Sequence, residues 1–478
     1  MKPTSMILTL ILLCGLISSC GDVEPIDNPE ATSVGESTDT DESTDPNSVC
    51  DLPSDVRFDG ETFTFAVYEN ANTQNLMIVD EEDGETINDA IYQRKIKTEE
   101  RLGVTIEQVI YNDNFNEFQN PILAGDNAYD VGNIRCTDAL KVWQEGMIIP
   151  ASELPYVNIE KNYWNKSFND SLTLCGEQYV IIGDMMISTL DLTYALLFNK
   201  QLIADYNLDS PYDLVNSGAW TIDAMYDMMK QVATDVNGDT IMDDNDRYGY
   251  LSHPKQVLPN FWIAAGEMSV KKDEGDVPYL AMGEERFNDV IQKVFEVLWD
   301  AETYYLPTDQ LYDVPESSIK LFTNNQSLFM DSSFHHVQQL RSMETDFGIL
   351  PYPKYDESQE RYYSRVSYYN APIVPVTNNN LELTGALLEY FNYISSETVI
   401  PAYYDIVLYS KVSRDDESQA MLDLIFDSRV VDIGDTTLCA DIRDGFVATM
   451  FQTNDRKLAS KLPTAQSKID AFLSKMPE

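Results

Sequence analysis

Basic residues are scarce in this chain of 478 residues, which contains 32 Lys and Arg against 80 Asp and Glu. Its formal net charge is −48 at pH 7. Non-specific binding to nucleic acid needs a basic surface that displaces counterions, so this function class is excluded. Attraction to anionic lipid by charge is excluded for the same reason. The acidity is typical of a well-solvated protein surface.

Histidine is also rare, and the motifs of common enzyme classes are absent. The three histidines are His253 and the adjacent pair His335 and His336, whose side chains point in different directions on a helix or a strand. The sequence has no HExxH zinc motif, no Gly-x-Ser-x-Gly elbow and no Walker phosphate loop. Carboxylate pairs for glycoside hydrolysis could be drawn from any 80 acids, so they carry no information. We therefore expect a protein that is not an enzyme.

Cysteines are few and scattered. Apart from two in the first twenty residues, the chain has Cys50, Cys136, Cys175 and Cys439 with no CxxC spacing, so a zinc site is not expected. One or two disulfides could form outside the cell, but the sequence favours no particular pairing.

Only one long apolar run is present, and it lies at the N-terminus. A short positive start precedes the apolar residues 6–17, and small residues come next, before Cys20. This pattern predicts a secretory signal peptide over residues 1–19, since the run is too short to span a bilayer. The segment Ile17-Ser18-Ser19-Cys20 resembles the lipobox of bacterial lipoproteins, whose cysteine is lipidated and becomes the new N-terminus. Lipidation of Cys20 is therefore expected; ordinary secretion, with this cysteine incidental, is the alternative.

The segment after Cys20 is rich in Asp, Glu, Ser, Thr and Pro, and it lacks Lys and Arg. Such a segment cannot bury enough apolar surface to offset the entropy of ordering it. We predict a disordered acidic tether over residues 20–50 that holds a folded body off the membrane. The remaining residues, 51–478, are more than one hydrophobic core usually supports.

Strand and helix patterns alternate in the first third of the folded part. Phe63–Tyr68, Val104–Ile110 and Tyr129–Ile134 are predicted strands, and a helix capped by Thr86 is predicted to run to about Leu102. This alternation indicates an α/β fold with a parallel, doubly wound sheet. Ligands of such sheets gather at the carboxyl ends of the strands. The loops after the first and third strands are therefore the first places to look for a site.

Further elements are predicted along the rest of the chain. Thr221 is predicted to cap a helix on which three methionines and Val232 form a stripe, and core packing is favoured over a binding surface for Met225, Met228 and Met229. The other predicted elements are strands at Tyr179–Asp184, Thr193–Phe198, Ser327–Met330, Phe347–Leu350 and Ala371–Val376, and helices at Leu383–Ile394 and, capped by Ser413, at Asp415–Phe426.

The segment Asp235–Asp246 has the spacing of a calcium-binding loop. Oxygen-bearing groups fall at positions 1, 3, 5, 7, 9 and 12, where position 7 supplies its backbone carbonyl; these residues are Asp235, Asn237, Asp239, Ile241, Asp243 and Asp246. Two features depart from the EF-hand pattern, because position 6 is Thr240 instead of Gly and position 12 is Asp instead of Glu. We predict a structural Ca²⁺ site, with a plain acidic turn as the alternative. No organic cofactor is expected.

Several short motifs occur in a fixed order along the chain. They are Gly84–Tyr92, Tyr129-Asp130, Leu197–Lys200, Gly218–Thr221, Gly348–Lys354 and Pro401–Tyr404. In this order, and together with the lipobox, they resemble family 1 extracellular solute-binding proteins, the sugar-binding lipoproteins of bacterial ABC importers. The resemblance runs from about Phe58 to Val431, and each motif alone is short.

The resemblance implies a two-lobed periplasmic-binding-protein-like fold. Each lobe would be a doubly wound sheet flanked by helices, and the lobes would be hinged around a central ligand cleft. The chain would cross between the lobes near Gly183–Leu192 and near Leu350–Tyr363. The expected order is the first part of lobe 1 in residues 51–185, lobe 2 in 186–355, a return to lobe 1 in 356–398, and C-terminal helices packing mainly on lobe 2 in 399–478.

A sugar presents hydroxyl groups and an apolar C–H face, so its site needs aromatic rings beside carboxylates, amides or arginines. The candidate ligand-binding residues come after predicted strands or lie near the expected crossings; they are Tyr68, Glu69, Arg135, Thr137, Asp184, Asp191, Trp262, Ser333, Phe334, Tyr368 and Tyr369. Asp138, which follows the third predicted strand, and Trp164, a possible stacking platform, are further candidates, whereas Trp220 and Trp299 are expected to pack internally. Ordinary packing is the alternative for each aromatic residue, and a solvated surface position is the alternative for each acid.

These observations predict a monomeric protein, anchored by lipid to the outer face of the cell membrane, that captures a mono- or oligosaccharide between two closing lobes. It would deliver this solute to the permease subunits of an ABC importer. Binding would stabilise the closed form, because the ligand contacts both lobes only there. The alternative is a surface glycan-sensing or adhesive protein that uses the same cleft without import. The identity of the solute stays open, since peptides, polyols and glycosides also fit.

Overall fold

The computed structural model describes residues 45–69, 77–112, 114–299, 304–305, 316–337, 340, 343–407 and 416–475. The predicted signal peptide, Cys20, most of the predicted tether and the predicted cap Ser413 lie outside these residues. The last residues assigned to the tether contact the folded body, because the Lys161 ammonium donates to the Pro46 carbonyl at 2.9 Å. None of the described helices is long and apolar enough to cross a membrane.

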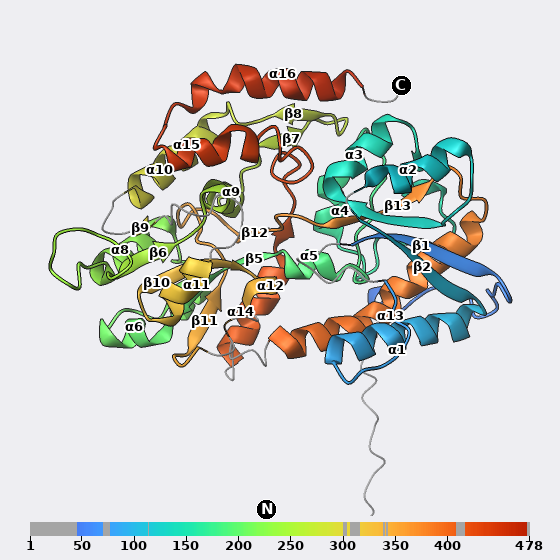
Figure 1. The fold of residues 1–478 in the computed structure, drawn as a ribbon, viewed down its shortest axis with the longest axis horizontal. Helices are drawn as coiled ribbons and strands as arrows, with labels where there is room; N and C mark the ends of the chain where they lie inside the picture. The colour runs from blue at the N-terminus through green and yellow to red at the C-terminus, as the bar shows by residue number, and fades with distance from the viewer. Residues whose placement is uncertain are drawn as a thin grey trace, which may run out of the picture. The chain divides into compact units, whose positions relative to one another are not determined.

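The first five-stranded sheet is built around parallel strands from the N-terminal part of the chain (Figure 1). β1 (Thr62–Tyr68) pairs in parallel with β2 (Thr105–Tyr111) on one side and with β3 (Val131–Arg135) on the other. β13 (Asn370–Pro375) pairs antiparallel with β3, and β4 (Ile148–Ile149) pairs antiparallel with β13. The three predicted strands are confirmed. Because β13 comes from much later in the chain, the lobe built on this sheet, lobe 1, is discontinuous in sequence.

The second five-stranded sheet forms lobe 2 and mixes parallel and antiparallel pairs. Its strand order is β11 (Phe347–Leu350), β5 (Tyr194–Asn199), β10 (Ser327–Ser333), β6 (Tyr248–Leu251) and β9 (Tyr304–Tyr305). β10 is antiparallel to β5 and parallel to β6, and every residue of β5 and β10 is buried. A central strand buried on both faces needs helices on both sides, and helices of this lobe supply that cover (Figure 1).

Two long helices of lobe 1 pack along each other, α1 (Thr86–Leu102) and α13 (Leu381–Val407) (Figure 1). The buried Arg94 on α1 stacks over the Phe391 ring at 4.3 Å and donates to two backbone carbonyls outside the helix. Glu85, instead of the predicted Thr86, occupies the N-cap of α1. The helix predicted to end at Ile394 continues through Pro401, because the residues beyond it keep one face buried.

Most of the remaining helices belong to lobe 2. Thr221 caps α8 as predicted, since its hydroxyl accepts the Ala224 N–H at 3.2 Å, and the methionine stripe of α8 is buried in the core. The other helices are α2 (Phe115–Ala124), α3 (Cys136–Gln144) and α4 (Lys166–Leu172) in lobe 1, α5 (Ile187–Asp191) between the sheets, and in or against lobe 2 α6 (Lys200–Asp205), α7 (Pro211–Ser217), α8 (Ile222–Val232), α9 (Pro254–Ala264), α10 (Glu285–Leu298), α11 (Glu316–Thr323), α12 (Phe334–Val337), α14 (Asp416–Asp427), α15 (Ala448–Gln452) and α16 (Leu462–Leu473).

Smaller elements complete the fold. A hairpin of β7 (Val270–Lys272) and β8 (Pro278–Leu280) lies beside α16, and short 3-10 or π-helical turns cover residues 46–48, 151–153, 443–447 and 458–460. The four cysteines of the described part, Cys50, Cys136, Cys175 and Cys439, are free thiols.

The segment 179–184, predicted as a strand, is irregular and makes only a single bridge between Gly183 and Trp164. The reason is a tight passage at Gly183, where a Cβ atom would lie 2.2 Å from the Asn392 side-chain oxygen and 2.7 Å from the Tyr163 carbonyl. Only glycine fits this position, and from it the chain leaves lobe 1.

Three chain segments that connect the lobes lie side by side. Thr193 bridges Val366, and the Ser367 N–H donates to the Leu192 carbonyl at 3.1 Å. β12 (Ser364–Arg365) then pairs in parallel with β14 (Arg429–Val430). We refer to these three segments, which contain Leu192–Thr193, Ser364–Ser367 and Arg429–Val430, as the crossings. They form a narrow three-segment connection, which is the geometry of a hinge.

Candidate functional site

Polar and aromatic side chains gather where the parallel strands of lobe 1 end. Tyr68 ends β1, Tyr111 ends β2 and Arg135 ends β3, while Asp138 lies one turn into α3 and Tyr368 lies just before β13. We call these five residues the strand-end cluster. Carboxyl ends of parallel strands meet at one edge of a sheet, which explains why residues distant in sequence come together here.

The Arg135 guanidinium organises this cluster. Its Nε donates to Asp138 Oδ2 at 2.6 Å, and its planar group lies over the Tyr68 ring at 5.0 Å. The Tyr68 and Tyr111 rings are 5.8 Å apart. The side chains of Arg135 and Asp138 are 24% and 14% exposed, so the pair is reachable from outside but partly shielded from water. Burial raises the pKa of the Tyr368 hydroxyl, and the Arg135 charge opposes that effect.

Two buried polar atoms at this edge have no hydrogen-bond partner among the described residues, the Tyr111 hydroxyl and Asn370 Oδ1. The Asn370 amide nitrogen donates to the Tyr68 carbonyl at 3.5 Å, which places this side chain against the cluster. Buried polar atoms are normally satisfied, so unpaired ones beside a stacked Tyr–Arg–Asp group indicate a place for a ligand or water. Aromatic faces, a guanidinium and a carboxylate together suit a hydroxylated ring.

Residues of the C-terminal segment approach the same edge. Arg443 donates to the Ser367 carbonyl at 3.4 Å, and its charge acts on the Cys136 thiol at the start of α3. Its neighbour Asp444 pairs with Lys255 at the N-terminus of α9, at 3.3 Å. Charged groups anchored in lobe 2 therefore lie near the strand-end cluster of lobe 1.

Some predicted ligand residues adjoin this cluster. Glu69 is exposed directly after β1, and Thr137 is half-buried in the first turn of α3. Ser333 ends β10 in lobe 2 and shares a hydrogen bond of 2.8 Å with His336 Nδ1. Together with Tyr68, Arg135 and Tyr368, these are the predicted residues that the structure brings to or near an edge between the lobes.

Other predicted residues are engaged in packing. Trp262 is fully buried and donates to Asp432 at 2.9 Å, so it has no surface for the predicted stacking on a sugar. Asp191 is buried and accepts the Tyr403 hydroxyl at 2.8 Å. Two further rings belong to the core: Phe334 lies 4.8 Å from Phe426, and Tyr369 lies edge-on to Phe168 at 5.1 Å. Trp164 is also buried, because its indole N–H donates to Glu389.

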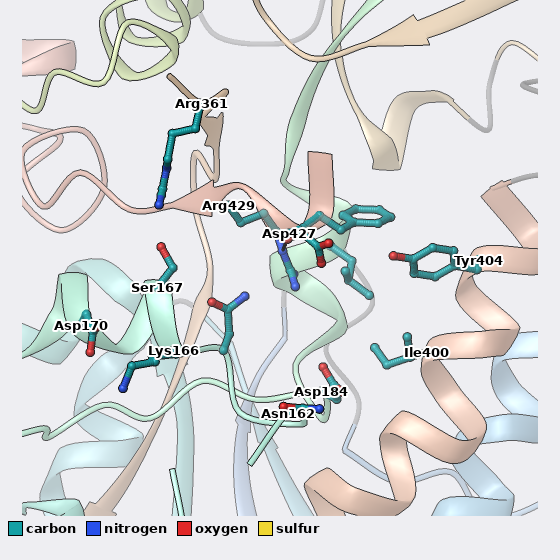
Figure 2. A pocket seen from close by; sticks show the side chains of 13 residues that line it. Asn162, Lys166, Ser167, Asp170, Asp184, Arg361, Ile400, Tyr404, Asp427 and Arg429 are labelled. Carbon is teal, nitrogen blue, oxygen red and sulfur yellow. Dashed lines mark hydrogen bonds between the residues drawn. The ribbon is translucent and has the colours of Figure 1, made fainter. Parts of the chain in front are cut away.

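Asp184 lies elsewhere, in a cavity of about 570 Å³ beside the crossings, which we call the crossing pocket (Figure 2). Its lining comes from both sides of the crossings and comprises Asn162, Asn165, Lys166, Ser167, Asp170, Asp184, Leu190, Arg361, Ile400, Tyr404, Phe426, Asp427 and Arg429. Burial raises the pKa of the Asp184 carboxyl to about 7, and the Arg429 charge opposes that rise. None of the five strand-end cluster residues lines this pocket.

The sequence rules missed several residues of these two sites. Tyr111 obeys the same strand-end rule as Tyr68 and could have been found by applying it to the second strand. Asp138 was not missed, because it was a candidate as a residue that follows the third predicted strand, and the structure pairs it with Arg135. Arg361 and Arg429 carry no such signal, because only the crossing geometry brings them to Asp184.

The predicted calcium loop lies between α8 and β6 and is closed by its own carboxylates. Asp235 accepts the Gly238 and Thr240 N–H groups, and the fully buried Asp246 accepts those of Val236 and Asp243. No group of three His, Cys, Asp or Glu side chains gathers closely enough to hold a metal ion anywhere in the described residues. The calcium site stays a prediction.

Solved structures with a similar fold include two sugar complexes and one sugar transporter, by their own descriptions. One is the ABC substrate-binding protein Lmo0181 from Listeria monocytogenes in complex with cycloalternan, with 13% identity, a TM-score of 0.55, and coverage of 87% of this chain and 100% of that one. A cyclo/maltodextrin-binding protein complexed with maltotetraose has 12% identity, a TM-score of 0.56, and coverage of 87% and 96%. A sugar transporter from Rhizobium etli in an open conformation has 12% identity, a TM-score of 0.58, and coverage of 86% and 99%.

At these identities the similarity shows the fold, and the predicted α/β, two-lobed periplasmic-binding-protein-like architecture is confirmed. The resemblance noted in the sequence is confirmed at the level of that fold. No family model matches the sequence, and no curated protein matches it. The residue boundaries expected for the lobes stay predictions.

The buried carboxyl of Asp331 in lobe 2 should make the stability of the protein depend on pH. Burial raises the pKa of this carboxyl to about 7, while Ser252, Arg365 and Asn260 oppose the rise. Between about pH 4, where an unfolded aspartate titrates, and pH 7, the folded state therefore keeps a proton that the unfolded state has lost. The free energy of unfolding therefore decreases as pH rises through this range, by up to about 1.4 kcal/mol per pH unit.

Asp331→Asn should flatten this profile and raise stability at pH 8, because asparagine mimics the protonated acid at every pH. The measurement is the urea midpoint at pH 4.5 and pH 8. Asp289→Asn, on the exposed face of α10, is the matched control and should keep the original slope. Equal slopes in Asp331→Asn and the original chain would contradict the assignment.

Proposed function

We propose that this chain is an extracellular, lipid-anchored binding protein that captures a mono- or oligosaccharide between its lobes and delivers it to the permease of an ABC importer. The observation that carries the proposal is the strand-end cluster, which faces lobe 2 residues in a fold whose solved relatives bind sugars. Catalysis is not part of this proposal. A monomer is expected.

The cluster would bind a sugar through three kinds of group: an aromatic ring, a guanidinium and a carboxylate. The Tyr68 ring would contact the apolar side of the sugar, and the charged Arg135–Asp138 pair lies beside that ring, where it would meet neighbouring hydroxyls. Contacts to lobe 2 exist only when the lobes close, so binding shifts the population toward the closed form.

Binding should depend on the Arg135–Asp138 pair. Arg135→Ala and Asp138→Asn should each weaken the best-bound sugar of a mono- and oligosaccharide panel by about 10–100-fold, since a hydrogen bond to a charged group contributes about 1.5–3 kcal/mol. Titration calorimetry and the ligand-induced rise in melting temperature measure this. The control Arg57→Ala removes an exposed arginine that precedes β1 and should bind normally. Unchanged affinity in both cluster variants would contradict the site.

We also propose that Asp235–Asp246 binds Ca²⁺ as a structural ion. The loop already turns tightly, with Thr240 at a φ of 69°, and its Asp and Asn oxygens together with the Ile241 carbonyl form the donor set that calcium prefers. The ion would neutralise carboxylates that otherwise repel one another. It would supply no chemistry beyond this.

Removal of calcium should lower the melting temperature by about 3–5 °C, the shift expected when an ion at about 100–1,000 times its Kd is withdrawn from a protein of this size. The measurement is thermal unfolding in excess calcium and in excess chelator. The double variant Asp235→Asn with Asp239→Asn should melt at the chelated temperature in both buffers, whereas Asp209→Asn, an exposed aspartate outside the loop, should keep the full response. If the chelator leaves the melting temperature of the original chain unchanged, the calcium proposal is contradicted.

Anchoring and delivery are tested together at the N-terminus. Two or more acyl chains on Cys20 would hold the protein stably at the membrane. Cys20→Ser should move the protein from the membrane fraction to the soluble fraction and reduce uptake of the bound sugar by cells, whereas Cys14→Ser should change neither. Anchored protein that binds sugar but supports no uptake would favour a glycan-sensing role over import.

A further inference from the structure

The crossing pocket has the size and setting of a second ligand site. Its volume of about 570 Å³ falls within the 300–1,000 Å³ typical of small-molecule pockets. One wall comes from α4 and the segment before α5 in lobe 1, and the other comes from the residues that flank the paired strands β12 and β14. Figure 2 shows side chains from these segments and from α13 surrounding one space.

The floor of the pocket presents polar groups with unused hydrogen-bonding capacity. Arg429 donates its Nε to the Phe426 carbonyl at 2.9 Å and Nη1 to the Thr189 hydroxyl at 3.3 Å, which leaves Nη2. Among the described residues, the Asp184 carboxylate and the Tyr404 hydroxyl are each influenced by burial and by charges but accept or donate no hydrogen bond. Hydrogen bonds from a ligand to partly buried polar groups of this kind contribute strongly to binding free energy, because these groups otherwise have no partner.

The charges of the pocket balance. The lining contains three acidic side chains, Asp170, Asp184 and Asp427, and three basic ones, Lys166, Arg361 and Arg429; Lys166 also pairs with Glu160 at 2.8 Å. A charged ligand would upset this balance, whereas hydroxyl groups can donate to the carboxylate and accept from the guanidinium at once. Leu190, Ile400 and Phe426 add an apolar surface beside these groups, suited to the C–H face of a ring.

We propose that the crossing pocket is a second binding site, separate from the strand-end cluster, for a neutral polyhydroxylated ring of about monosaccharide size. Asp184 and Arg429 bind neighbouring hydroxyls of this ring, and Tyr404 donates to a third. The apolar side chains contact its C–H face.

Occupancy of this site is coupled to the lobe arrangement. The walls are carried by segments on both sides of the crossings, so any change in the hinge alters the distance between them. A ligand that fits one arrangement better shifts the lobe equilibrium by its differential affinity, and the coupling to the solute at the strand-end cluster is reciprocal.

The test uses the full mature chain with glucose, galactose, mannose, xylose and myo-inositol as probes, measured by titration calorimetry and ligand-observed NMR. Tyr404→Phe and Asp184→Asn keep the side-chain shapes and should each weaken one of the probes by tenfold or more while leaving the solute of the strand-end cluster unchanged. Tyr156→Phe, an exposed tyrosine outside the pocket, is the control and should bind all probes normally. Unliganded melting temperatures confirm that each variant is folded.

The outcomes separate this proposal from the proposed function. Probe binding that survives both pocket variants and disappears in Asp138→Asn would overturn the second site and leave the strand-end cluster standing. Probe binding that is lost in the pocket variants and untouched by Asp138→Asn would support the pocket, whereas a main solute whose binding is also untouched by Asp138→Asn would overturn the strand-end assignment. A panel in which no probe binds would overturn the second site as stated. Coupling is measured as the change in solute affinity at saturating pocket probe, and an unchanged affinity would overturn the coupling.

Discussion

The buried ion pair between Arg365 and Asp435 is the interaction on which the arrangement of the crossings depends. Arg365 Nε lies 2.6 Å from Asp435 Oδ2, and the two side chains are 1% and 0% exposed. The same guanidinium donates to the side chains of Gln256 and Asn260 on α9 and lies over the Tyr194 ring at 4.9 Å. Breaking such a pair by removing one partner typically costs about 3–5 kcal/mol, because the other charge stays buried. β12 is therefore fixed to lobe 2.

The segment between β12 and β13 takes its position from this anchor. Val366 and Ser367 pair with the first crossing, and Tyr368 and Asn370 then reach the strand-end cluster of lobe 1. The cluster is thus built partly from the end of a hinge segment whose start is held in lobe 2. A movement between the lobes must alter the position of Tyr368 relative to β10 and α9. This connection would couple the geometry of the strand-end cluster to the proposed closure of the lobes.

Most strands and helices could be predicted from the sequence, because local residue patterns determine them. Alternation identified the parallel strands, and Thr221 marked the start of α8 through its own hydrogen bond. The site was only partly readable. Trp262 was predicted to meet ligand, but its indole is held in the core by Asp432, which lies far away in the sequence and gives no local signal. Likewise, nothing in the sequence near Arg429 indicates that it faces Asp184; the meeting is set by the crossings.

The overall charge of −48 contrasts with the balanced charges of both sites. At the strand-end cluster Asp138 is paired with Arg135, and in the crossing pocket Asp184 faces Arg429. A single charge that loses water when lobes close carries a large desolvation cost, whereas a compensated pair carries less. Sites that must lose water repeatedly therefore favour compensated pairs. A compensated pair offers donors and acceptors without net charge, which selects hydroxylated neutral molecules over ions. The same constraint supports the proposal that so acidic a chain binds an uncharged solute.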